Sequence, residues 1–209
     1  MRWLALLLVW GSLLTSGADP RDFTDPAEYY SHLAEDRHFF FKHHATIWAV
    51  LTREYHQALV DEDLWPQGRP TNFGKLQLLP LLESDEQRVI REAWEFQMND
   101  RGYARIIVVK ARKVYCSTEI QNLGQHELIF QPGSRMLTMA HISDATEELF
   151  LIGKTVYENL DADLQPPLEP GSNFSLSEGV TYDFGVDEWG NHVKSFAKCQ
   201  TAGGHEGKD

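Results

Sequence analysis

The sequence lacks most of the features that define common classes of enzyme and nucleic-acid-binding protein. It has 19 Lys and Arg against 31 Asp and Glu, a formal net charge of −12, which argues against binding along a phosphate backbone. It contains no G-x-S-x-G elbow, no H-E-x-x-H motif, no glycine-rich phosphate loop and no internal repeat. These absences exclude the usual signatures of serine hydrolases, zinc proteases and nucleotide-binding folds.

Five of the nine histidines lie in one short region, which raises the question of a metal site: His32, His38, His43, His44 and His56. No two of them are three or four residues apart, so no pair lies on one face of a helix at close range. We therefore expect these histidines to be structural or exposed, and we expect no metal.

Long apolar runs are also scarce. The leucine-rich run from Leu4 to Leu14 is followed by Ser16, Gly17 and Ala18 at the spacing of a signal-peptidase site, which predicts a secretory signal peptide over residues 1–18. An uncleaved N-terminal anchor is the alternative. No later segment approaches 18 uninterrupted apolar residues, so no membrane span is predicted. We expect a secreted protein.

Only two cysteines are present, Cys116 and Cys199. In an oxidising compartment an even pair predicts a disulfide, and two buried free thiols are the alternative. The tripeptide Asn173-Phe174-Ser175 is a sequon, so we expect a glycan on Asn173 and an exposed loop around it.

Helices are predicted in the N-terminal half. Asp25-Pro26 is typical of a helix start. Ser84 and Gln87 form a capping box for a further helix that ends near residue 99 or 100, before Gly102. Between these helices, Ile47–Leu51 is predicted to be either the end of a helix or a strand. Phe73–Leu82 is predicted to be a strand.

Beyond Gly102 the pattern favours β structure. Strands are predicted over five segments: Tyr103–Val109, Val114–Cys116, Glu127–Phe130, Met136–Ile142 and Leu149–Tyr157. A hairpin follows, formed by Val180–Val186 and His192–Cys199, and residues 203–207 are predicted to be a frayed tail. The sequence therefore predicts one α+β domain over residues 19–209, with N-terminal helices followed by an antiparallel β-rich half.

The segment Gln125-His126-Glu127, followed by Leu-Ile-Phe-Gln-Pro-Gly-Ser-Arg-Met, resembles the Q-x-E element of the mono-ADP-ribosyltransferase family. The resemblance implies an ADP-ribosyltransferase-like fold and NAD as the substrate. Glu127 would then be the catalytic carboxylate and Gln125 the contact to the acceptor side chain. Arg53 and Ser84 would bind NAD.

The chemistry fits a carboxylate at this position. The bond between nicotinamide and ribose breaks through an oxocarbenium-like species, whose charge a nearby carboxylate stabilises. The first hypothesis is therefore a secreted NAD-dependent mono-ADP-ribosyltransferase, or NAD glycohydrolase, that acts on an extracellular or host protein. The alternative is a secreted, non-catalytic binding or signalling protein, such as an inactive relative of the same fold. A small-ligand carrier with a β-rich pocket is a third hypothesis.

Overall fold

The computed structural model describes residue 20, residues 23–108 and residues 116–202. The predicted signal peptide and the predicted C-terminal tail lie outside these residues. The described chain contains helices and strands in this order: α1 Pro26–Glu35, α2 Arg37–His44, β1 Thr46–Val50, α3 Arg53–Asp61, β2 Leu76–Pro80, α4 Asp85–Arg101, α5 Cys116–Phe130, β3 Arg135–Ala140, α6 Ser143–Glu158, the 3-10 turn η2 Ala162–Leu164, β4 Val180–Val186 and β5 His192–Thr201.

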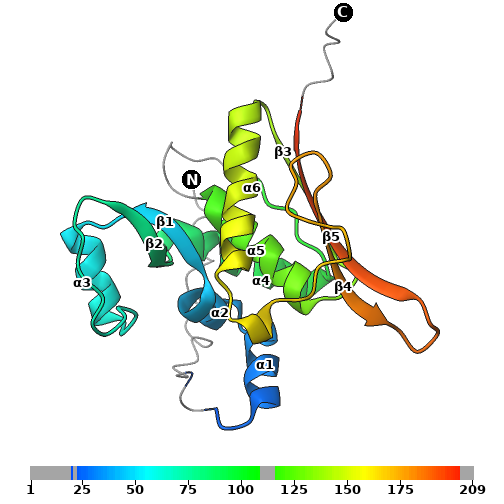
Figure 1. Cartoon of the computed structure of the whole chain (residues 1–209), viewed down its shortest axis with the longest axis horizontal. Helices are drawn as coiled ribbons and strands as arrows, with labels where there is room; N and C mark the ends of the chain where they lie inside the picture. The colour runs from blue at the N-terminus through cyan, green and yellow to red at the C-terminus, as the bar shows by residue number, and fades with distance from the viewer. Residues whose placement is uncertain (1–19, 21–22, 109–115, 203–209) are drawn as a thin grey trace, which may run out of the picture.

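Helix α5 lies at the centre of the molecule, between two sheets (Figure 1). β1 and β2 form a two-stranded antiparallel sheet beside α3 at one end, and β3, β5 and β4 form a three-stranded sheet at the other. β5 is the middle strand, parallel to β3 and antiparallel to β4. The mixture of helices and strands confirms the α+β class, but the parallel β3–β5 pair and helices α5 and α6 make the second half less β-rich than predicted.

Two hydrophobic clusters form the core. The first packs α1, α2, α4 and α5 around phenylalanines of α2, among them Phe40, which is fully buried. The second packs Leu128 of α5 against Val180 and Tyr182 of the three-stranded sheet. α5 contributes residues to both clusters, and 10 of its 15 residues are buried. The helix is therefore enclosed on nearly all sides.

Capping explains the helix boundaries that were predicted correctly. Asp25 caps α1 through a side-chain hydrogen bond to the amide of Ala27. Ser84 and Gln87 form the predicted capping box of α4, and Gly102 ends that helix in the left-handed conformation, at φ 72°. The predicted hairpin is also confirmed as β4 and β5.

Three strand predictions are wrong. Residues 127–130 are the last turn of α5, and residues 149–157 belong to α6. Residues 103–108 have no regular secondary structure and are mostly exposed, with Ile107 93% exposed. The segment predicted over residues 114–116 falls largely outside the described residues, and Cys116 begins α5.

Two glycines let α5 approach its neighbours closely. A Cβ atom on Gly124 would lie 2.2 Å from the Met136 sulfur, and one on Gly153 of α6 would lie 2.6 Å from Nε2 of Gln125. Neither position accepts a larger residue without a local shift. These glycines weakened the helical pattern in the sequence, although each is needed for helix packing.

Candidate functional site

A cavity of about 260 Å³ opens between α2, α4 and the segments that follow α3 and β2. Phe41 of α2 forms part of its apolar wall, together with Leu64, Leu81 and Leu82. Its polar lining is His38, Lys42, Glu62, Glu83, Arg88 and Arg91. An apolar wall with a few converging polar groups is the usual composition of a small-molecule site. We call this space the α2–α4 cavity.

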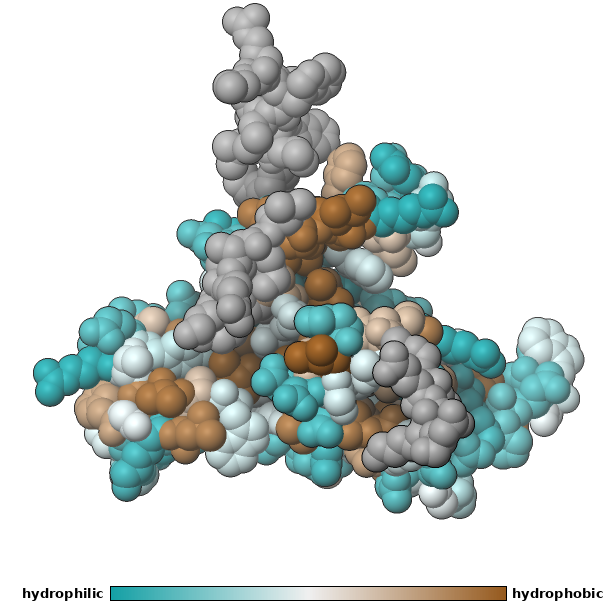
Figure 2. All heavy atoms as spheres, turned by 90° about the horizontal axis from the view of Figure 1, so that it is seen from above, coloured by the Kyte–Doolittle hydropathy of each residue, from teal (hydrophilic) through white to brown (hydrophobic). Residues whose placement is uncertain are grey.

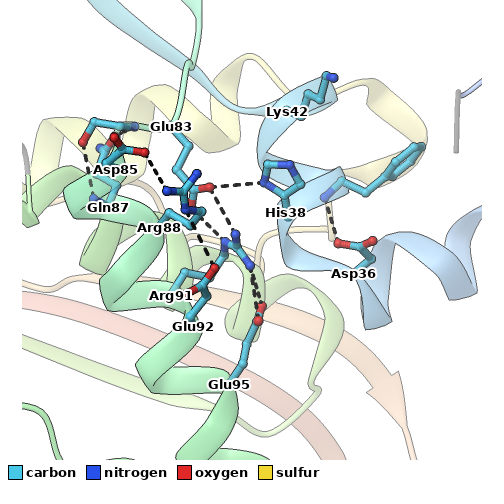
Figure 3. A network of polar contacts seen from close by, with 12 residues as sticks. Asp36, His38, Lys42, Glu83, Asp85, Gln87, Arg88, Arg91, Glu92 and Glu95 are labelled. Carbon is cyan, nitrogen blue, oxygen red and sulfur yellow. Dashed lines mark hydrogen bonds and ion pairs between the residues drawn. The ribbon is translucent and has the colours of Figure 1, made fainter. Parts of the chain in front are cut away.

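Glu83 lies at the centre of the polar lining (Figure 3). Its two carboxylate oxygens accept hydrogen bonds from Nε and Nη2 of Arg91, at 2.7 and 3.1 Å, respectively. Nδ1 of His38 lies 3.3 Å from Oε2 of Glu83. Arg91 also contacts Glu95 one turn further along α4, at 3.2 Å. Two helix-borne side chains, His38 of α2 and Arg91 of α4, thus contact one carboxylate.

The surrounding charges keep Glu83 and Arg91 ionised. Burial alone would raise the pKa of Glu83, but the hydrogen bonds from His38 and Arg91 outweigh it and hold the pKa below its usual value. Burial opposes the charge of Arg91 as well, yet Glu83 and Glu95 raise its pKa. The pair is a buried, bidentate ion pair, and such pairs depend on both partners.

Glu119 of α5 interacts electrostatically with the same charges. Its side chain is fully buried, and its two carboxylate oxygens have no hydrogen-bond partner in the described structure. Burial, followed by the nearby charge of Glu83, raises its pKa to about 8, although Arg91 opposes this shift. The carboxyl group is therefore protonated at neutral pH.

Lys42 and Arg88 supply the remaining positive charge of the cavity. Nζ of Lys42 contacts Glu62 at 2.8 Å, and Nη2 of Arg88 contacts Asp85 at 2.7 Å. Both cations are partly exposed. An ammonium has three N–H donors and a guanidinium has five, so each side chain keeps donors that its ion pairs do not use. Glu83 is occupied more completely than these two cations are.

The residues predicted for ADP-ribosyl transfer do not gather at this cavity or at another shared site. Glu127 is in α5 and forms an ion pair with Arg37, at 2.5 Å. Gln125 is buried and accepts a hydrogen bond from the hydroxyl of Tyr182, at 3.1 Å. Two residues that are two positions apart on a helix point in different directions, so α5 does not present them together as a strand edge would.

The two predicted NAD-binding residues also lie apart. Ser84 accepts a hydrogen bond from the amide of Gln87 as the cap of α4. Arg53 is the exposed first residue of α3, which lies at one end of the molecule, away from α5 (Figure 1). Among the described residues, no hydrogen bond or ion pair joins any two of Arg53, Ser84, Gln125 and Glu127.

The two cysteines are both buried, and no disulfide joins them. Cys116, at the start of α5, belongs to the first hydrophobic cluster, whereas Cys199 lies in β5, the middle strand of the three-stranded sheet, where it pairs in register with Thr138. Burial raises the pKa of the Cys199 thiol. The predicted disulfide is thus not present in the structure. Asn173, the predicted glycan site, is exposed in the loop before β4.

Part of the cavity could have been found from the sequence. Arg91 and Glu95 are four residues apart on a helix that was predicted correctly, and this spacing favours an ion pair. The contact between His38 and Glu83 joins residues that are far apart in the chain, and no local pattern announces it. The described residues contain no group of three or more His, Cys, Asp and Glu side chains that could hold a metal ion.

None of the helices in the described part of the chain is long and apolar enough to cross a membrane. No protein-family model matches the sequence, and a search of curated proteins found no similar chain.

Proposed function

We propose that this chain is a secreted, non-catalytic binding protein that holds a small organic anion in the α2–α4 cavity. The observation that carries the proposal is that Lys42 and Arg88 both line a cavity that also has an apolar wall. A ligand with a carboxylate and a short apolar body would satisfy both halves of this lining.

The charge of the lining favours an anion over a cation. Glu83 already accepts two hydrogen bonds from Arg91 and contacts His38, so little acceptor capacity is left on it. Lys42 and Arg88 keep unused donors. A carboxylate that enters the cavity would therefore find charge-assisted hydrogen bonds, which are among the stronger polar contacts in proteins.

The size of the cavity limits the ligand. At about 260 Å³ it is smaller than the pockets of roughly 300 Å³ and above that hold drug-sized ligands. Phe41 and Leu81, both buried, supply apolar surface for an aromatic ring or a branched chain. A compound such as 3-phenylpropionate has the required charge and shape.

A thermal-shift titration tests this proposal with a matched pair of ligands. We expect 3-phenylpropionate to raise the melting temperature and its neutral amide to leave it unchanged, because only the carboxylate engages the cations. A ligand at 100 times its Kd stabilises the folded state by about 2.7 kcal/mol. An equal response to the acid and the amide, or no response to either, would contradict the proposal.

Variants connect the response to the cavity. We expect the double variant Lys42→Gln, Arg88→Gln to lose the response to 3-phenylpropionate. Arg101→Gln is the matched control, since Arg101 is an exposed cation at the far end of α4 and its partner is Asp100. NAD belongs in the same titration. Stabilisation by NAD together with NAD turnover that Glu127→Gln abolishes would support the transferase hypothesis instead.

A further inference from the structure

The lining of the α2–α4 cavity carries more chemical information than the outer surface does. On the face of the molecule seen from above, apolar patches alternate with hydrophilic ones (Figure 2), and scattered exposed apolar residues are normal for a protein surface. In the cavity, by contrast, the partners of the polar groups are known, so the groups that remain for a ligand can be identified. His38 is a lining residue to which the anion site gives no role.

The contact with Glu83 determines which nitrogen of His38 carries the hydrogen. Nδ1 lies 3.3 Å from Oε2 of Glu83 (Figure 3), and Arg91 holds that carboxylate in place with two hydrogen bonds. An ionised carboxylate only accepts hydrogen bonds, so the contact is favourable when Nδ1 bears the hydrogen. A carboxylate partner fixes the tautomer of a histidine in this way. In the neutral ring, Nε2 is then the acceptor.

Nε2 is the ring nitrogen that a ligand can reach. Nδ1 of His38 is buried, although 30% of the side chain is exposed, so the exposed part belongs to the other atoms of the side chain. His38 lines the cavity. Within the described parts of the chain, no residue forms a hydrogen bond with Nε2. The cavity therefore has an acceptor with unused capacity as well as the two cations.

This acceptor lies next to one of the cations. His38 and Lys42 are four residues apart on α2, which places them on one face of the helix, one turn apart, and both line the cavity. The ammonium of Lys42 only donates hydrogen bonds, whereas Nε2 of the neutral imidazole accepts one. A cationic donor beside a neutral acceptor matches a carboxylate that has a hydroxyl on the neighbouring carbon.

We propose that the anion held in the α2–α4 cavity is a 2-hydroxy carboxylate. Its carboxylate contacts Lys42 and Arg88, and its hydroxyl donates a hydrogen bond to Nε2 of His38. This inference rests on the proposed anion site and adds the hydroxyl group to it.

The same lining discriminates against two related classes of acid. A 2-oxo acid presents only an acceptor oxygen at this position, so Nε2 of His38 is left without a donor. A 2-amino acid offers a donor, but its ammonium lies close to Lys42 and Arg88 and is repelled by both. The hydroxyl combines a donor with no charge.

Calorimetric titration of the full chain tests the inference with acids that share one aromatic ring. The measurement is the Kd of 3-phenyllactate, 3-phenylpropionate and phenylpyruvate near pH 8, where an ordinary imidazole is neutral. The two enantiomers of 3-phenyllactate are titrated separately. We expect the better enantiomer to bind about 5-fold more tightly than 3-phenylpropionate, the effect of one added hydrogen bond. Phenylpyruvate should bind no more tightly than 3-phenylpropionate.

Variants assign this preference to His38. His38→Leu removes the acceptor, so we expect the ratio of the two Kd values to fall to about 1 while 3-phenylpropionate still binds. Arg88→Gln is the matched control, because it should weaken the binding of both acids and leave their ratio unchanged. His38→Phe keeps a ring at this position without either nitrogen, and it takes the place of His38→Leu if circular dichroism shows that variant to be unfolded.

The outcomes separate this inference from the proposed function. If neither 3-phenyllactate nor 3-phenylpropionate binds, the anion site itself is overturned, and the role of His38 with it. If both bind with equal affinity, the hydroxyl contact alone is overturned and the anion site stands. A preference for 3-phenyllactate that persists without the imidazole would also overturn the contact with His38.

Discussion

Two buried ionisable groups on α5, Glu119 and His126, lie in opposite kinds of environment. Glu119 is close to the charges of Glu83, Arg91 and Glu95 and has no hydrogen-bond partner in the described structure. His126 lies among aromatic rings, with its ring centroid 5.2 Å from that of Phe40, and its Nε2 is 2.9 Å from the carbonyl of Leu33. The two residues are seven positions apart, which is about two turns on one helical face.

Burial suppresses the charge of both groups in spite of these different surroundings. Desolvation raises the pKa of Glu119 to about 8 and lowers that of His126 to about 4. At neutral pH the acid keeps its proton and the base does not take one. Neither a charged nor an aromatic neighbourhood compensates for the loss of water at these positions.

The two shifts have opposite consequences for stability. The folded state keeps the proton of Glu119 up to about pH 8, whereas the unfolded state loses it above its ordinary pKa of 4.5, so the free energy of unfolding falls as pH rises through this range. His126 becomes protonated below pH 6.5 in the unfolded state but only below about pH 4 in the folded state. The free energy of unfolding therefore falls as pH drops through this range. Between 4.5 and 6.5 the two effects oppose each other.

Removing the cation beside Glu119 should give the largest effect. Arg91→Ala leaves the buried Glu83 without its guanidinium partner, and loss of one partner of a buried ion pair costs about 3–5 kcal/mol. The free energy of unfolding in urea at pH 7 measures this loss. Arg88→Ala is the control, since this half-exposed cation on the same helix should cost less than about 1 kcal/mol. Equal losses in the two variants would contradict the central role of Arg91.

Glu119→Gln should remove the loss of stability that Glu119 causes as pH rises. Glutamine does not ionise, so the variant lacks a contribution that falls by about 1.4 kcal/mol per pH unit. Its free energy of unfolding relative to the wild type should therefore rise by about 3 kcal/mol between pH 5 and 7. Urea unfolding at several pH values measures the two slopes. The exposed Glu147→Gln is the control and should follow the wild type. Parallel slopes for Glu119→Gln and the wild type would show that Glu119 ionises normally.

His126→Gln should remove the loss of stability that His126 causes as pH falls. The His126 contribution to the free energy of unfolding should fall by about 2 kcal/mol as pH falls from 6.5 to 5, because the unfolded state takes up a proton that the folded state excludes, so the variant should gain that much relative to the wild type. The variant should lack this contribution, while glutamine still offers a donor for the Leu33 carbonyl. The exposed His192→Gln is the control. Unchanged acid sensitivity in His126→Gln would mean that other groups cause it.

Glu127→Gln should have the smallest effect on stability, although Glu127 adjoins His126. Its ion pair with Arg37 is partly exposed, at 20% and 16% for the two side chains, and such pairs contribute about 1 kcal/mol or less. The melting temperature should therefore hardly change. A loss comparable to that of Arg91→Ala would show that the Arg37 ion pair is as important as the buried pair in the α2–α4 cavity.

The sequence predicts elements best where their signals are local. Ser84, Gln87 and Gly102 mark both ends of α4 because capping depends on neighbouring residues. The β4–β5 hairpin is equally local, since its two strands flank a short turn that begins with Asp187 and contains Gly190 at positive φ. Neither element needs information from distant parts of the chain.

The wrong predictions depend on packing that local sequence patterns do not reveal. Because α5 is buried on nearly all sides, its inward positions include Gln121, Asn122 and Gln125, and no amphipathic period is visible. Residues 103–108 are mostly apolar and have strand propensity, but no neighbouring strand pairs with them in the described structure. The cavity depends on contacts between α2 and the start of α4, which no local pattern encodes.

The central position of α5 has a consequence for how the chain folds. Its side chains complete both hydrophobic clusters, so neither cluster can be fully assembled until this helix is in place. A fragment that ends before residue 116 would lack part of the first cluster, and one that starts after residue 130 would lack part of the second. We therefore expect urea unfolding to be a single cooperative transition in which both ends of the molecule lose structure together.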